Sequence, residues 1–211
     1  MIRSLVLVAL FFCCLNSRGQ YSGYTEVKNA ESFKKLFVQS ASATESIQAD
    51  FTQEKSLTLL SEKIISSGKF CFRKKDKLRM EYIKPYSYLL ILNGGKIYVR
   101  DGERETKISA GSNPAFQQVN RILIDCVSGN MLDNPDFQYR IFENAGSWLV
   151  EFKPMASNLK ELYKNINIVL DKKDFTASAI GLYDATGDKT NIRFQNKQIN
   201  AQIPDSQFNI P

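Results

Sequence analysis

The fold is decided by residues 68–101, which read GKFCFRKKDKLRMEYIKPYSYLLILNGGKIYVRD. Apolar residues alternate with polar ones along much of this stretch, and turn-forming residues interrupt it at Lys74–Lys77, at Pro85 and at Asn93–Gly95. Alternation with a period of two is typical of a half-buried β-strand. Because the turns are short, consecutive strands must be antiparallel neighbours. The stretch therefore predicts the centre of an antiparallel sheet.

The strand pattern continues on both sides of that stretch. The predicted strands are Ile47–Glu54, Ile64–Arg73, Leu78–Ile83, Tyr88–Asn93, Lys96–Asp101, Phe137–Glu143, Ser147–Pro154, Tyr163–Asp171, Ala177–Asp184 and Thr190–Gln195, with Phe208 in a short closing segment. An opening helix is expected in Ala30–Ala43. Its apolar residues at helical spacing are Phe33, Leu36 and Phe37. In Asn113–Leu132 apolar residues recur at steps of three and four, which predicts one or two inserted helices.

This arrangement predicts an α+β fold, a strongly curved antiparallel sheet with helices on one face. The concave side needs a cover, and the interior is either a filled core or a cavity. The residues expected to line it are large and apolar: Phe51, Phe70, Phe72, Leu78, Met80, Tyr82, Leu90, Leu92, Phe152, Ile168, Leu170, Ile180, Leu182 and Phe194 on strands, with Ile122 and Leu123 on the inserted helices. A slip of one residue would invert the set, because Tyr88–Leu92 is apolar on both faces.

The N-terminus predicts export. Met1–Arg3 forms a positive start, Leu5–Leu15 is an almost unbroken apolar run, and small or polar residues lead to Gln20. This order is typical of a signal peptide, and the run is about half of the ~20 residues that a membrane-spanning helix needs. We expect residues 1–20 to be removed, which leaves residues 21–211 as a single soluble domain in the periplasm.

Four cysteines divide into two pairs. Cys13 and Cys14 lie in the leader, where no small residue precedes either of them as a lipid-modified cysteine would require. Cys71 and Cys126 remain after cleavage and lie among large apolar residues. This favours burial as small apolar side chains over a disulfide, which an export compartment would permit. Their spacing matches no metal motif, and no metal or other cofactor is predicted.

The composition argues against several classes of protein. The chain has no histidine, which removes Ser-His and Cys-His nucleophilic pairs and two-histidine zinc motifs. It has no phosphate-binding glycine-rich loop, because Gly94-Gly95 belongs to a hairpin turn. The formal net charge is +6, two charges of which come from Arg3 and Arg18 of the leader. The other basic residues are scattered along the chain, so no nucleic-acid partner is expected.

The order of several short motifs resembles the LolA family of outer-membrane lipoprotein carriers. In the first half these are Phe51-Thr52-Gln53-Glu54-Lys55, Gly68-Lys69-Phe70-Cys71-Phe72, Leu78-Arg79-Met80-Glu81-Tyr82 with Pro85, and Leu90 through Asn93-Gly94-Gly95-Lys96-Ile97-Tyr98. In the second half, the segments similar to the family's later strands and ending are Phe152-Lys153-Pro154, Ile166–Asp171 and Phe208–Pro211. The resemblance covers nearly the whole mature chain.

The resemblance implies a half-open, unclosed β-barrel with a helical lid over an apolar cavity for acyl chains. In that family an ABC transporter complex of the inner membrane loads the carrier with acylated lipoprotein, and an outer-membrane acceptor receives it. Each CH₂ left in water costs about 0.8 kcal/mol, so acyl chains need an escort across the periplasm. We therefore expect a monomeric, non-catalytic periplasmic carrier with its lid within Asn113–Leu132.

The resemblance also implies a latch for the lid. Members of the family carry an arginine at the end of the strand that here reads Phe72-Arg73-Lys74-Lys75, where it hydrogen-bonds the lid closed. Alignment through Gly68 puts Lys74 at that place, with Arg73 just before it. Three alternatives follow. The latch is Arg73, or it is Lys74, which lacks the bidentate fork of arginine. In the third alternative there is no latch, and these cations solvate a turn.

Two other functions remain open. A lipid-sensing or signalling module on the same scaffold would need a second domain or an extension that binds a partner. A secreted carboxylate-dependent hydrolase would need two acids converging in a cleft. The acids that such a cleft could draw on include Glu54, Glu81, Asp101 and Glu151.

Overall fold

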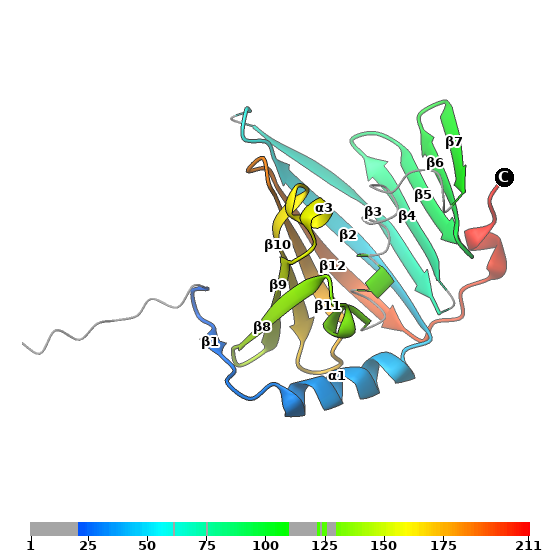
Figure 1. The fold of residues 1–211 in the computed structure, drawn as a ribbon. Coiled ribbons are helices and arrows are strands. Elements are labelled where there is room, and N and C mark those ends of the chain that lie inside the picture. Colours follow the sequence, from blue (N-terminus) through cyan, green and yellow to red (C-terminus); the bar gives the residue numbers. More distant parts are fainter. Residues whose placement is uncertain (1–20, 61, 75, 110–121, 123, 126–129) are drawn as a thin grey trace, which may run out of the picture.

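A computed structural model describes residues 21–60, 62–74, 76–109, 122, 124–125 and 130–211. Its strands are β1 (Thr25–Glu26), β2 (Ser46–Ser56), β3 (Lys63–Arg73), β4 (Lys77–Lys84), β5 (Tyr88–Asn93), β6 (Lys96–Asp101), β7 (Arg104–Ser109), β8 (Phe137–Glu143), β9 (Ser147–Pro154), β10 (Tyr163–Asp171), β11 (Ala177–Asp184) and β12 (Lys189–Ile199). They form one 12-stranded sheet in the order β1-β8-β9-β10-β11-β12-β2-β3-β4-β5-β6-β7. The sheet curls around an interior (Figure 1).

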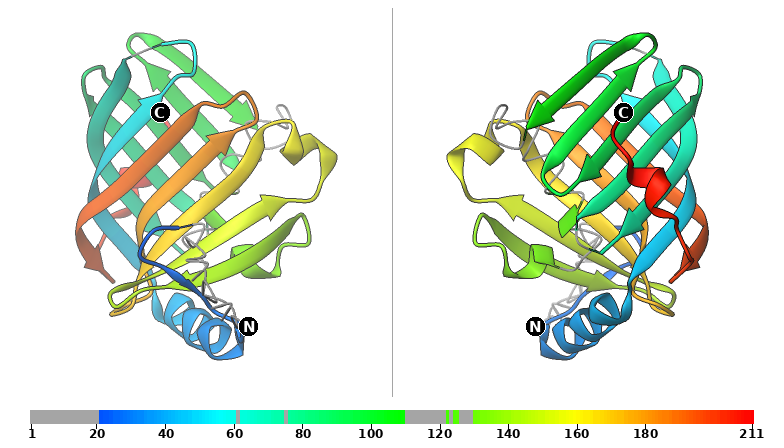
Figure 2. Two further views of the ribbon diagram at one scale, coloured as in Figure 1. Left: turned by 90° about the vertical axis from the view of Figure 1, so that its left-hand side faces the viewer. Right: turned by 90° about the vertical axis from the view of Figure 1, so that its right-hand side faces the viewer.

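The sheet is antiparallel and unclosed, as predicted. Each pair of neighbouring strands is antiparallel. The two ends of the sheet are β1 and β7, which stand apart in both views of Figure 2. The predicted class, a strongly curved antiparallel sheet with few helices, is therefore confirmed.

The helices with described bounds are few and short. They are α1 (Glu31–Ala43), α3 (Ser157–Lys160) and two 3₁₀ turns, η1 (Asn130–Asp133) and η2 (Asp205–Phe208). Phe33 and Phe37 of α1 are buried as predicted, but Leu36 is 46% exposed, so the apolar stripe of this helix is narrower than its spacing indicated. Ile122, Ile124 and Asp125 are helical within the predicted insertion.

Some elements were missed, and some predictions lie outside the described residues. Strands β1 and β7 and helix α3 were not predicted from the sequence, and β12 continues four residues beyond its predicted end at Gln195, to Ile199. Outside the described residues lie the signal peptide (1–20), Leu123, Cys126, Lys75 and most of the predicted lid. These remain predictions.

The strands divide their residues between two faces. Phe70 and Phe72 of β3 belong to the main apolar cluster, whereas Cys71 belongs to a separate cluster on the opposite face. The main cluster also contains Ile97 of β6 and Val150 of β9, strands that lie far apart in the sheet. Such residues can meet only across the inside of the curl. We call this side the inner face and the other side the outer face.

The C-terminal segment covers part of the outer face. After β12 the chain crosses β3, β4 and β5 from outside (Figure 2). Ile203 and Phe208 pack on Cys71, which is a buried, free thiol. Asn93 donates a hydrogen bond of 3.0 Å to the Phe208 carbonyl, and Ile210 packs against the outer-face cluster of β5 and β6. This apolar part of the outer face is therefore not open to solvent.

The segment before α1 covers another part of the outer face, over β8, β9 and β10. The Tyr21 hydroxyl donates a hydrogen bond to Glu151, and its ring meets that of Phe142 edge-on at 4.9 Å between centroids. The hydroxyls of Tyr24 and Ser147 are 2.7 Å apart. The two terminal segments thus bury outer-face residues at separate places on one sheet.

Gly68 marks a close approach between strands. It stands opposite Phe51 of β2 and Tyr82 of β4, next to a shift in the pairing of β3 with β4. A Cβ atom at this position would lie 1.9 Å from the Glu81 carbonyl oxygen and 2.9 Å from the Phe51 ring. Only glycine lets the Phe51 ring and the backbone of β4 come so near.

We therefore expect Gly68→Ala to lower the free energy of unfolding by about 2–3 kcal/mol, because backbone atoms must move to admit the methyl group. Gly146→Ala is the matched control, since a Cβ atom there meets nothing within 4 Å. Urea unfolding of both variants measures the difference. Equal midpoints for the two variants would contradict this reading of Gly68.

Candidate functional site

The inner face brings the predicted lining residues together. The described members of the predicted set that are buried in its apolar cluster are Phe51, Phe70, Phe72, Leu78, Met80, Leu90, Leu92, Ile122, Phe152, Ile168, Leu170, Ile180 and Phe194. Tyr82 and Leu182 are partly buried against the same cluster. On each described strand, the predicted residues therefore all lie on the inner face. Leu123 lies outside the described residues.

Further members of the cluster were missed by the sequence analysis. They include Ile97, Ile166 and Ile192, each buried and each two residues from another inner-face side chain. The step of two along a strand, as from Ile166 to Ile168, could have identified them. The apolar inner face is thus larger than predicted, and it runs without interruption from β8 to β6.

Several tyrosines place hydroxyl groups on the inner face. Tyr82 lies edge-on to Phe51 and Tyr88, with ring centroids 4.8 and 5.5 Å apart, and its hydroxyl donates a 2.9 Å hydrogen bond to Gln53. Burial raises the pKa of Tyr82 and Tyr88, and it raises the pKa of Tyr163 to about 12. These shifts mean that the hydroxyls lie in a poorly solvated interior, where an ionised group is disfavoured.

Helix α1 covers one end of the curl (Figure 1). The Phe33 ring packs against Trp148 of β9 and against Phe175, in the turn between β10 and β11, at centroid distances of 5.1 and 6.1 Å. The Ser40 hydroxyl donates a 2.7 Å hydrogen bond to the Asp174 carbonyl in the same turn. At the end of the helix, the carbonyls of Ser42 and Ala43 accept hydrogen bonds from Lys74 and Asn200. Ring contacts and several hydrogen bonds therefore fix the helix to the sheet.

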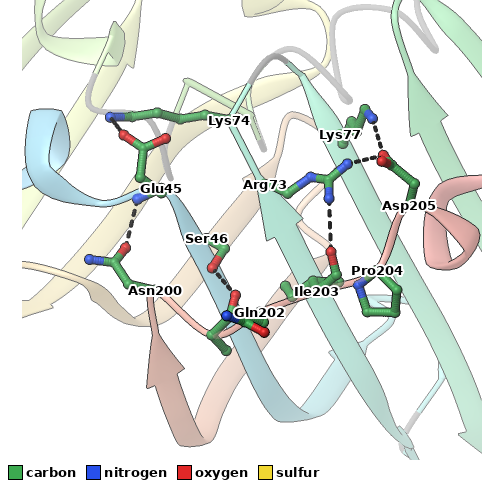
Figure 3. A pocket seen from close by; sticks show the side chains of 11 residues that line it. Glu45, Ser46, Arg73, Lys74, Lys77, Asn200, Gln202, Ile203, Pro204 and Asp205 are labelled. Atoms are coloured by element: carbon green, nitrogen blue, oxygen red, sulfur yellow. Dashed lines mark hydrogen bonds and ion pairs between the residues drawn. The ribbon is translucent and has the colours of Figure 1, made fainter.

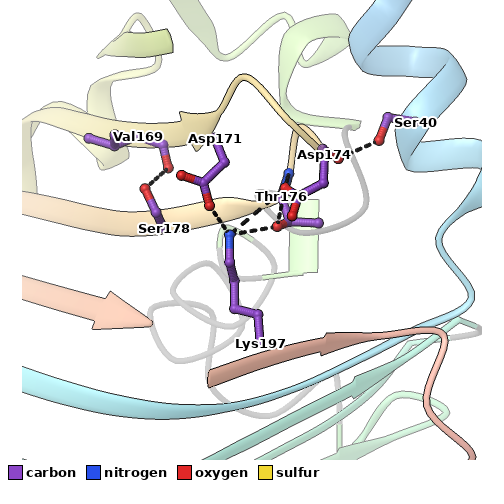
Figure 4. A network of polar contacts seen from close by, with 7 residues as sticks. All are labelled: Ser40, Val169, Asp171, Asp174, Thr176, Ser178 and Lys197. Carbon is purple, nitrogen blue, oxygen red and sulfur yellow. Dashed lines mark hydrogen bonds and ion pairs between the residues drawn. The ribbon is translucent and has the colours of Figure 1, made fainter. Parts of the chain in front are cut away.

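A polar network holds the turn on which α1 rests (Figure 4). A bulge in β12 between Gln195 and Gln198 contains Lys197. Its ammonium group binds the Asp171 carboxylate, lies 2.8 Å from the Thr176 hydroxyl and 3.8 Å from Asp174 Oδ1, and the side chain is 13% exposed. The lysine thus links β12 to both ends of the turn between β10 and β11.

The two latch candidates point in different directions, Arg73 toward the C-terminal segment and Lys74 toward Glu45 (Figure 3). Arg73 donates to the Ile203 carbonyl at 2.8 Å and pairs with Asp205, and Lys74 lies 2.8 Å from a Glu45 carboxylate oxygen. These contacts join β3 to the C-terminal segment and to the segment after α1. Most of the predicted lid lies outside the described residues, so the assignment of Arg73 or Lys74 as a latch stays a prediction.

A polar hollow of about 760 Å³ surrounds these residues. Its cations are matched by acids, because Lys77 and Arg73 both reach Asp205, and Lys74 reaches Glu45. Hydrogen bonds from Lys77 and Arg73 hold the pKa of Asp205 below its usual value. The hollow is therefore a set of internal ion pairs beside the C-terminal segment, and it is separate from the apolar inner face.

No metal-binding cluster of three or more acidic or cysteine residues is present in the part of the chain that the structure describes. Within the same ranges, no helix is both long and apolar enough to cross a bilayer. Among the described residues, Glu151 is a buried carboxylate. It faces outward and accepts a hydrogen bond from Tyr21, so it does not lie on the inner face.

The sequence matches a family model described as outer membrane lipoprotein carrier protein LolA, over residues 42–211. An outer-membrane lipoprotein carrier protein from Methylibium petroleiphilum is 24% identical over 162 residues, 76% of this chain and 76% of that protein. Another, from Cupriavidus pinatubonensis, is 30% identical over 149 residues, 68% of this chain and 65% of that protein.

Solved structures share the fold. An uncharacterized conserved protein from Thermus thermophilus has a TM-score of 0.51 and 8% identity, with 87% of this chain and 95% of that chain covered. A chain of the Pseudomonas aeruginosa MucA/MucB complex has a TM-score of 0.52 and 12% identity, with 87% of this chain and 62% of that chain covered. At these identities the likeness concerns the fold alone.

The Lys197 network generates a stability prediction. Lys197→Ala leaves the facing carboxylates without their cation, so we expect the free energy of unfolding to fall by about 1–3 kcal/mol. Lys69→Ala is the control, because Lys69 also pairs with an aspartate, Asp50, but its side chain is 57% exposed. It should change stability by less than about 0.5 kcal/mol. Equal losses of unfolding free energy for the two variants would contradict the stabilising role of the Lys197 network.

Proposed function

The chain belongs to the LolA family of outer membrane lipoprotein carrier proteins, and from this premise we propose that its inner face holds the acyl chains of lipoproteins in the periplasm. The observation that carries the proposal is the continuous apolar inner face, built from every strand between β8 and β6 and free of buried carboxylates among the described residues. Such a face offers acyl chains an environment similar to the lipid that they leave.

The free energy of the acyl chains explains why a carrier is needed. At about 0.8 kcal/mol for each CH₂, two chains of about sixteen carbons would cost about 25 kcal/mol in water. No lipoprotein would leave a membrane at that cost without a partner that shields its chains. A carrier must therefore replace most of these contacts, yet release them again to an acceptor.

The inner face has to open to do this. In the structure its side chains are buried against one another, so acyl chains can enter only where a covering segment moves away. We propose that the segment predicted as a lid, Asn113–Leu132, supplies this movement. Its described residues in the apolar cluster are Ile122, Met131 and Leu132, which would then leave their places when cargo enters.

The proposed route runs from the inner to the outer membrane. An inner-membrane ABC transporter would load the monomeric carrier with acylated lipoprotein, and an outer-membrane acceptor would take over the cargo. The matched family and its curated relatives are carriers, in agreement with the expectation that the chain is not an enzyme. The likeness to the MucA/MucB complex concerns the fold, so it favours no sensing function.

A release assay tests the proposal. The mature protein is added to energised spheroplasts of its own host, the membranes are pelleted, and the supernatant is examined for lipoprotein in complex with the protein. We expect acylated lipoprotein to appear there only when the protein is added. Folded protein that releases none, although the inner-membrane transporter is present and active, would overturn the proposal.

Two neighbouring substitutions test whether the inner face is the binding surface. Leu182 and Tyr183 are adjacent, both partly buried, and on opposite faces of β11. Leu182→Lys puts a charge against the acyl chains and should reduce lipoprotein release about tenfold, the equivalent of about 1.4 kcal/mol. Tyr183→Lys should leave release within about twofold of the original. If both variants lose release equally while remaining folded, the cargo does not depend on the inner face.

A further inference from the structure

Most of the exposed large apolar side chains in the described part of the chain gather at the end of the sheet away from α1. They are Leu59 (96% exposed), Tyr86 (80%), Ile65 (60%), Leu60 (56%), Ile83 (54%) and Ile64 (43%), which we call the apolar rim. Elsewhere in the described chain, exposed apolar side chains are few and separate, such as Leu36 and Val38 on α1. A solitary exposed leucine is ordinary, but a group of this size usually marks a contact surface.

The rim is formed by two neighbouring hairpins. Leu59 and Leu60 lie in the turn between β2 and β3, and Tyr86 lies in the turn between β4 and β5. The antiparallel pairing of Ser67 with Lys84 puts Ile65 of β3, two residues before Ser67, at the level of the turn that carries Tyr86. Both turns lie at the end of the curl opposite α1 (Figures 1 and 2). The apolar side chains therefore project from the tips of the sheet.

We propose that the apolar rim inserts into the surface of a lipid bilayer and attaches the carrier transiently to the membrane. The side chains project from hairpin tips, whereas a site for a protein segment is normally a groove. A bilayer accepts any protruding apolar group, and a tyrosine such as Tyr86 suits the level of the headgroups.

The charges near the rim are compatible with an anionic bilayer. Residues 54–65 and 83–86 contain three lysines and two glutamates. Lys63 pairs with Glu54 at 2.8 Å, whereas Lys84 stands between Ile83 and Pro85 and is exposed. Because the basic excess is small, apolar insertion must supply most of the attachment. Binding should therefore persist when salt screens the charges.

The apolar rim lies beside one end of the inner face, so attachment there would bring this end to the bilayer. The aromatic contacts of Phe51, Tyr82 and Tyr88 occupy the same end of the inner face, because Tyr82 pairs with Gly68 just below the rim. If the proposed function holds, acyl chains that leave the inner face at this end would meet the bilayer directly. Attachment itself concerns the empty protein and does not depend on cargo.

Vesicle flotation tests the proposal without any lipoprotein. The mature protein is mixed with vesicles of phosphatidylethanolamine and phosphatidylglycerol and floated on a density gradient at low and at high salt. We expect a bound fraction at both salt concentrations. Leu59→Glu should reduce that fraction about fivefold, because a carboxylate replaces the most exposed apolar group, whereas the fold has no contact there to lose.

Leu36→Glu is the matched control, since Leu36 is an exposed leucine on α1 at the opposite end. It should float as the original protein does. Failure of the original protein to float, an equal loss in both variants, or binding that disappears at high salt would each overturn the proposal. Because the vesicles contain no lipoprotein, failure of lipoprotein release in spheroplasts would leave this result standing, and the reverse also holds.

Discussion

The structure depends on one constraint: a sheet of 12 strands has a continuous apolar face, and the described residues form no second sheet to cover it. The sheet solves this by curling until strands far apart in its order face each other, so that Ile97 of β6 and Val150 of β9 share one cluster. Helix α1 then covers one end. Because no second sheet of described residues supplies the cover, the proposed lid would expose the face by moving, which suits the proposed reversible binding of acyl chains.

The two ends of the curl differ in how they are held. At the α1 end, Lys197 links β12 to the turn between β10 and β11. At the same end, Arg73 and Lys77 hold the C-terminal segment against the sheet through Asp205. At the other end the hairpins carry exposed apolar side chains, with Leu59 almost fully in solvent. The two ends of the curl therefore differ, since ion pairs hold one end and the other presents exposed apolar side chains. If the inner face holds acyl chains as proposed, we expect cargo to pass at the end that carries the apolar rim.

Much of the fold followed from alternation. Phe70, Cys71 and Phe72 divide between two faces as a period of two requires, and most strand boundaries agreed to within a residue or two. Alternation could not decide the parity of β5, because Leu89 and Ile91 are also buried, under Ile210 of the C-terminal segment. That cover comes from residues more than a hundred positions away, which no local pattern contains.

Other features had no local signal at all. β7 carries one apolar residue, Ile108, among charged and small polar ones, and it becomes a strand by pairing with β6. The Lys197 network depends on a bulge in β12 that brings the lysine to Asp171. Leu36 of α1 is exposed, although it is spaced like Phe33 and Phe37, which are buried. Such features arise from tertiary packing, which overrides local preference.

The central claim is that acyl chains lie against the inner face, and photo-crosslinking in living cells measures this most directly. A photoreactive phenylalanine derivative is placed at Tyr82, on the inner face, or at Tyr183, on the outer face. We expect adducts between the Tyr82 position and lipoprotein acyl chains, and none from the Tyr183 position. Acyl adducts from the outer position, with none from the inner one, would contradict it.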